Sequence, residues 1–74
     1  MFSKNLFAKR LINLRESSGI SAMALSKAVG VSSAAISQFE HGVNYPHCTT
    51  LVALADYFDV SLDYLIGRSD HRVR

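Results

Sequence analysis

The sequence predicts an all-α fold, a compact bundle of five short helices. Apolar residues make up 49% of the 74 residues and recur at intervals of three and four, the spacing of one face of an amphipathic helix. Serines and glycines, which begin and end helices, separate these apolar segments. No segment shows the alternation of apolar and polar residues that a half-buried strand requires. Because none of the helices is long enough to be stable alone, each depends on packing against the others.

The first two helices are expected at about residues 4–17 and 21–28. The inward-facing apolar residues of the first helix have the spacing i, i+4, i+7; they are Phe7, Leu11 and Leu14. Gly19 suits the position after its last turn. Ser21 can cap the second helix, and Gly30 then lies at a sharp turn, where a left-handed backbone costs glycine little.

Three further helices are expected, at about residues 32–40, 48–58 and 61–66. Ser32 and Ser61 can cap the first and the last of these. The helices on either side of Gly30 have the outline of a helix-turn-helix, a motif that can lay its second helix in the major groove of DNA. We expect residues 1–67 to form one domain and residues 68–74 to be a frayed tail or the start of a linker.

The composition argues against several classes of protein. A single cysteine, Cys48, cannot form an internal disulfide, and we expect a buried, inert thiol in a reducing cytoplasm. The three histidines, His41, His47 and His71, lack the spacing of metal ligands, and there is no Gly-rich phosphate loop, so neither a metal, a cofactor nor an enzymatic activity is expected. No apolar run approaches the ~20 residues of a membrane span, and the first ten residues do not resemble a signal peptide.

The net charge of +2 is small, but the basic residues are unevenly distributed. All eight lie towards the two ends of the chain: Lys4, Lys9, Arg10, Arg15 and Lys27, then Arg68, Arg72 and Arg74. The middle is nearly neutral, and a mildly acidic stretch follows it: Asp56, Asp59 and Asp63. This distribution suits a protein with one face towards phosphates, and it equally suits ordinary solvated charges.

Motifs along most of the chain give a more specific signal. The first helix carries F-x-x-R-L-x-x-L-R, as Phe7, Arg10, Leu11, Leu14 and Arg15. The two-helix unit contributes Leu25, Ser26, Val29, Gly30, Val31, Ile36, Phe39, Glu40 and Gly42. A P-x-x-x-T-L-x-x-L-A segment begins at Pro46, and V-S-L-D-Y-L-I-G occupies residues 60–67. In this order and spacing, residues 5–67 resemble the lambda-repressor-like helix-turn-helix domain, the Cro/CI or XRE class of bacterial and phage transcription regulators.

The resemblance implies a function and a set of site residues. Relatives have an ion pair between the ends of the first and third helices, which here matches Arg15 and Glu40. The third helix would lie in the major groove, and with Ile36 and Phe39 facing the core, the candidates for base contact are Ser33, Ala34, Ser37 and Gln38. Gln38 can bond an adenine edge, Ser33 several bases, and Ala34 a thymine methyl. The candidates for phosphate contact are Lys27, Ser32, His41, Asn44 and Tyr45.

The chain also departs from the family pattern. No Lys or Arg lies between Ser32 and Glu40, and the glutamine that usually opens the second helix is replaced by Ala22. The strip Ala22-Met23-Ala24 is either tolerated surface or a contact with another protein. Two functions therefore remain open: a sequence-specific regulator, most simply a repressor, of double-stranded DNA, and an antirepressor- or antitoxin-like module with a protein partner.

With few cationic contacts a single domain should bind DNA weakly, so we expect a homodimer on a pseudo-palindromic operator. Three apolar side chains near the C-terminal end either support that dimer or complete the core: Tyr57, Tyr64 and Ile66.

Overall fold

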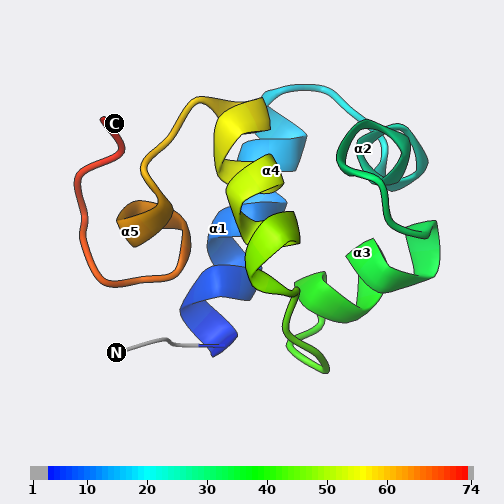
Figure 1. Cartoon of the computed structure of the whole chain (residues 1–74), viewed down its shortest axis with the longest axis horizontal. Helices are drawn as coiled ribbons and strands as arrows, with labels where there is room; N and C mark the ends of the chain where they lie inside the picture. Colours follow the sequence, from blue (N-terminus) through cyan, green and yellow to red (C-terminus); the bar gives the residue numbers. More distant parts are fainter. Residues whose placement is uncertain (1–3, 74) are drawn as a thin grey trace.

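Five helices and no strand make up residues 4–73, the part of the chain that the computed structural model describes. The helices are α1 (Lys4–Ser17), α2 (Ala22–Val29), α3 (Ser33–Glu40), α4 (Cys48–Phe58) and α5 (Leu62–Leu65). In Figure 1, α1 and α4 lie at the centre, with α2 and α3 on one side and α5 on the other. The all-α, five-helix prediction is confirmed. Residues 1–3 of the expected domain and Arg74 of the basic tail lie outside the described residues.

Three of the helices begin directly after a serine whose side chain caps them. The hydroxyl oxygens of Ser21, Ser32 and Ser61 accept hydrogen bonds from backbone N–H groups three residues on, at 3.1, 3.0 and 3.0 Å. Each cap satisfies a donor that the first turn leaves without an intrahelical partner. The helices therefore begin one residue later than the predicted ranges, with the capping serine just outside. At their ends, α2 runs one residue beyond 28 and α5 stops one short of 66.

Every helix contributes to one apolar core. The largest fully buried side chains come from all five helices and are Phe7, Leu11, Leu25, Ile36, Leu54 and Leu65. Phe7 of α1 also meets Phe39 of α3 edge to face, with ring centroids 6.3 Å apart. Burying one such side chain contributes about 1.5–3 kcal/mol. Because α3 supplies Ile36 and Phe39 to this core, its position is fixed by packing against the rest of the domain.

Cys48 is exposed, so the prediction of a buried thiol is wrong. Cys48 is the first residue of α4, and burial along this helix increases towards Leu54 and Ala55 in its C-terminal half. The first turn lies at the surface, where Thr49 is exposed as well. The expectation rests on the presence of a single cysteine, which does not show where along the helix the core ends.

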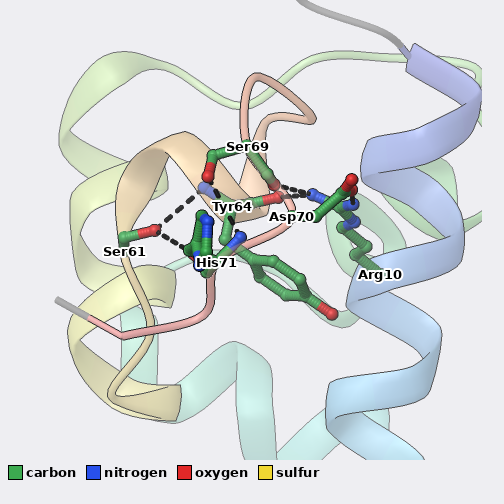
Figure 2. Close-up of polar contacts among 6 residues, drawn as sticks. All are labelled: Arg10, Ser61, Tyr64, Ser69, Asp70 and His71. Carbon is green, nitrogen blue, oxygen red and sulfur yellow. Dashed lines mark hydrogen bonds and ion pairs between the residues drawn. The ribbon is translucent and has the colours of Figure 1, made fainter.

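Residues 68–73 differ from a frayed tail, because α1 and α5 hold them through a polar cluster around Arg10 (Figure 2). The guanidinium of Arg10 donates hydrogen bonds to the carbonyl oxygens of Tyr64 and Ser69, and it pairs with the carboxylate of Asp70 at 2.8 Å. It also lies 4.1 Å from the centroid of the Tyr64 ring, a cation–π distance. Arg10 is itself buried, at 9% exposure, so it is a structural residue rather than one of the solvated charges.

The N-terminal end of α5 holds the same segment from the other side. The backbone N–H of Ser61 donates to the carbonyl oxygen of Arg72 at 2.9 Å, and its hydroxyl donates to that of His71 at 3.0 Å. We call residues 68–73 with Arg10, Ser61 and Tyr64 the C-terminal clamp. Most of its acceptors are backbone carbonyls, which every residue carries, so no pattern of residue types predicts it. Whether a linker begins here stays a prediction.

Gly67 makes the turn from α5 into the clamp possible. Its φ of +88° belongs to the left-handed region, and a Cβ at this position would lie 2.9 Å from a methyl carbon of Leu6. Any other residue would therefore be strained in its backbone and would press on α1.

Candidate nucleic-acid interface

The turn between α2 and α3 depends on two small residues. Gly30 adopts φ +80°, and the backbone N–H groups of Gly30 and Val31 both donate to the carbonyl oxygen of Ser26, at 2.9 and 3.0 Å. Ser26 is buried, and its hydroxyl donates to the carbonyl oxygen of Met23 at 2.6 Å. This arrangement closes the end of α2 and brings Ser32, the cap of α3, into place within two residues.

The ion pair between Arg15 and Glu40 joins the ends of α1 and α3. The Nε and Nη2 atoms of Arg15 donate to the two carboxylate oxygens of Glu40, at 2.6 and 3.1 Å. A third donor, Nη1, reaches the carbonyl oxygen of Ile20 at 3.2 Å, just before α2. The hydrogen bond to Glu40 is the main cause that raises the pKa of Arg15, against the lowering effect of burial. The pair is therefore two-pronged and largely desolvated, the geometry in which arginine fixes orientation as well as charge.

The four candidate base-contact residues all lie exposed on α3. They are Ser33, Ala34, Ser37 and Gln38. Ile36 and Phe39, by contrast, are buried against the other helices. The outward face of α3 is thus made of small and neutral side chains, so a partner surface can approach its backbone closely. No acidic side chain lies in its first turn, and Ser32 caps it with its hydroxyl oxygen.

The five candidate phosphate-contact residues are exposed too: Lys27, Ser32, His41, Asn44 and Tyr45. The ring Nδ1 of His41 lies 2.7 Å from the carbonyl oxygen of Ser37. Because a carbonyl can only accept, Nδ1 carries a hydrogen, and Nε2 is then the atom that can meet a phosphate, as a donor when the ring is protonated. Lys27 is the basic residue of the last turn of α2.

Residues of the loop after α3 make two side-chain contacts with helices, one with α3 and one with α1. The side-chain nitrogen of Asn44 donates to the side-chain oxygen of Gln38 at 3.1 Å. The ammonium of Lys4 lies 5.2 Å from the centroid of the Tyr45 ring. The sequence places Lys4 only among the basic residues near the N-terminus, and the structure places its ammonium beside the loop after α3. No sequence spacing could have indicated this, since Lys4 and Tyr45 are far apart in the chain.

Comparisons with known proteins agree with this geometry. Residues 11–65 match the model of the helix-turn-helix family. The chain belongs to the helix-turn-helix family. The crystal structure of the P22 c2 repressor in complex with a synthetic operator superposes with a TM-score of 0.82 at 38% identity, covering 86% of this chain and 97% of that one. A solution structure of the SOS-response repressor LexA from Eubacterium rectale superposes with a TM-score of 0.81 at 28% identity, covering 85% of this chain and 67% of that one.

One relative is a longer protein than this chain. An uncharacterized HTH-type transcriptional regulator, YobD of Bacillus subtilis (strain 168), is 29% identical over 65 residues, which are 88% of this chain. The chain spans 58% of the length of YobD. The family and these relatives place the chain among the helix-turn-helix domains of DNA-binding transcription regulators of the Cro/CI or XRE type.

The strip at the start of α2 is only partly a surface feature of this helix-turn-helix domain. Ala22 packs against the core, whereas Ala24 is exposed and Met23 has 60% of its surface exposed. The three apolar residues proposed for a dimer also differ in their exposure. Tyr64 and Ile66 are partly buried, with Tyr64 packed against the core, and Tyr57 is 45% exposed.

The described helices include none that is long and apolar enough to cross a membrane. Within residues 4–73, no three His, Cys, Asp or Glu side chains form a group that could hold a metal ion.

Proposed function

We propose that this domain is a sequence-specific binder of double-stranded DNA in a bacterial or phage transcription regulator, most simply a cytoplasmic repressor. In this proposal α3 lies in the major groove with its N-terminal end nearest the bases. The observation that carries it is the exposed, small-residue face of α3 in a fold that matches, at 38% identity, a repressor solved in complex with an operator.

The proposed base readers differ in how much they can discriminate. Gln38 presents a donor and an acceptor and can bond an adenine edge with both, worth about 1–3 kcal/mol of discrimination. Ser33 and Ser37 can bond several bases, and the methyl of Ala34 can contact a thymine methyl. Most of the sequence preference is therefore assigned to Gln38.

Phosphate contacts would position α3 without reading sequence. Ser32 already accepts a bond from its own helix, so its hydroxyl hydrogen is the part available to a phosphate oxygen. Lys27, His41, Asn44 and Tyr45 surround α3 in the sequence, and Lys4 joins them through Tyr45. A surface with so few full charges predicts a shallow salt dependence, since each neutralised phosphate changes the slope of log K against log salt by roughly 0.9.

The small number of cations is also the reason to propose a homodimer on a pseudo-palindromic operator. Two copies double the contacts, with half-sites about one helical turn apart. Sedimentation of the saturated complex should give two copies per operator. One copy per operator at saturation would overturn the dimer and leave the DNA-binding proposal standing.

The experiment that tests the main proposal is selection from a pool of random duplexes. Recovery of an inverted repeat would support DNA reading and dimerisation together. Gln38→Ala should lose enrichment at one base pair in each half-site, and Asn13→Ala, a change at an exposed position of α1, should leave the recovered sequence unchanged. A pool with no enriched sequence would contradict the proposal.

A second candidate function is a protein-interaction module of the antirepressor or antitoxin kind. The exposed Met23 and the absence of Lys and Arg from α3 favour it. This function would be favoured over the first if the protein enriches no DNA sequence and forms a complex with a protein partner. That complex should survive Gln38→Ala and be lost with Met23→Lys.

A further inference from the structure

The loop after α3 folds back onto the last turn of that helix. The backbone N–H of Val43 donates to the carbonyl oxygen of Gln38 at 2.9 Å, and that of Gly42 donates to the carbonyl oxygen of Phe39 at 3.2 Å. This places Asn44 beside the Gln38 side chain, where its amide nitrogen donates to the Gln38 amide oxygen at 3.1 Å. Both residues are exposed, so the Gln38 amide is held at one end and accessible at the other.

The direction of this hydrogen bond matters because the two ends of a glutamine amide have nearly the same shape and opposite chemistry. The oxygen only accepts and the NH2 only donates. In the structure the Asn44 NH2 group is the donor of this bond, so the Gln38 oxygen turns towards the loop. The Gln38 NH2 group is then directed away from Asn44.

We propose that Asn44 is a positioning residue that sets which end of the Gln38 amide is presented to a base edge. This inference rests on the proposed DNA-reading function of α3. With its oxygen held by Asn44 and its NH2 group presented, Gln38 makes one bond to a major-groove acceptor, purine N7 or thymine O4, in place of the two-bond contact with an adenine edge. It disfavours cytosine, whose major-groove edge offers the N4 donor. Asn44 thereby contributes to sequence preference without touching a base.

Two variants of Asn44 test the proposal through the base preference at the position that Gln38 reads. Asn44→Ala removes the hold, so discrimination there should fall about twofold to tenfold, the range of one neutral hydrogen bond. Asn44→Asp replaces the donor with an acceptor, which should bond the Gln38 NH2 group and turn the oxygen outwards. The preference should then shift towards bases with a donor, cytosine N4 or adenine N6.

A double-mutant cycle separates positioning from a direct phosphate contact. If Asn44 acts through Gln38, Asn44→Ala should change base preference in the wild-type background and leave it unchanged in the Gln38→Ala background. A phosphate contact would instead weaken binding to all sequences alike in both backgrounds. Asn13→Asp on α1 is the control for the added negative charge, and it should lower affinity without changing base preference.

A measurement without DNA completes the test. Nuclear magnetic relaxation of the Gln38 side-chain amide in the free protein should show a lower order parameter in Asn44→Ala than in the wild type. Unchanged side-chain order would overturn the positioning role. An enriched operator with the same base profile in wild type and both Asn44 variants would also overturn it, while the proposed function would stand. A pool without enrichment from wild-type protein would overturn both.

Discussion

The two sides of the domain are each tied to α1 by one arginine, but by different chemistry. On the side of α3, Arg15 bonds a carboxylate, Glu40, that is itself only 10% exposed. On the side of α5, Arg10 bonds two backbone carbonyls, and its carboxylate partner, Asp70, is 97% exposed. The first tie is a desolvated ion pair between two helices, and the second is a set of hydrogen bonds that holds an irregular segment.

Because of this difference, removing one partner should lower the stability of the domain more on the side of α3 than on the side of α5. Breaking a desolvated ion pair leaves a buried charge behind, whereas the carboxylate of Asp70 is already in water. The two arginines are five residues apart, so they leave α1 about 140° apart around its axis. One helix can therefore hold α3 and the C-terminal clamp independently, and the comparison can be tested by breaking each side separately.

The largest effect is expected from Arg15→Ala. The variant strands the carboxylate of Glu40 and removes the bond to Ile20, so the free energy of unfolding should fall by about 3 kcal/mol. Chemical denaturation measures this. The double variant Arg15→Met with Glu40→Leu should be more stable than Arg15→Ala, because it leaves no uncompensated charge. A loss below about 0.5 kcal/mol for Arg15→Ala would mean that the pair acts as a solvated one.

A smaller loss, about 2 kcal/mol, is expected from Arg10→Ala, which removes hydrogen bonds to two carbonyls and the contact with the Tyr64 ring. Hydrogen exchange should show faster opening of residues 68–73 while α3 stays protected. The control is Arg68→Ala, which removes an exposed pair with Asp63 at 3.7 Å and should cost almost nothing. Equal loss of protection in α3 and in the clamp would refute the independence of the two sides.

Two of the capping serines allow a matched pair of variants, and each should lower the free energy of unfolding by about 1 kcal/mol. Ser32→Ala and Ser61→Ala each remove one hydroxyl cap, at 3.0 Å in both helices. Thermal unfolding should show similar losses, with Ser61→Ala slightly larger because it also loses the bond to His71. Only Ser32→Ala should weaken binding to an operator. Weakened binding by both variants at temperatures where both are folded would argue against a specific role for Ser32.

The smallest effect is expected from Asp70→Asn. The carboxylate is almost fully exposed, so its pair with Arg10 should contribute less than about 0.5 kcal/mol. The two carbonyl bonds of Arg10 remain in this variant. Chemical denaturation of Asp70→Asn and of Arg10→Ala therefore separates the stability contributed by the ion pair from that contributed by the hydrogen bonds to backbone carbonyls. A loss as large as that of Arg10→Ala would assign the stability of the clamp to the ion pair.

The same comparison explains what could be predicted from the sequence. The apolar spacing and the serine caps are side-chain features that a sequence displays directly, and the pairing of Arg15 with Glu40 is implied by the family resemblance. The structure contains all three. The clamp uses the carbonyl oxygens of Tyr64, Ser69, His71 and Arg72, and backbone acceptors leave no mark in a sequence.

The surface predictions show the same limit. Burial of Cys48 is expected from its being a lone, inert thiol, but composition does not say where the core ends along the helix. The contacts of Lys4 with Tyr45 and of Asn44 with Gln38 depend on the path of a loop. The base and phosphate contacts themselves stay predictions.

The position of the clamp has a practical consequence. In Figure 1, residues 68–73 and α3 lie at opposite ends of the longest dimension of the domain. A fluorophore, an affinity tag or a sensor surface joined beyond residue 73 would therefore project away from α3. The domain can be immobilised through that end for binding measurements with the recognition surface left open to a duplex.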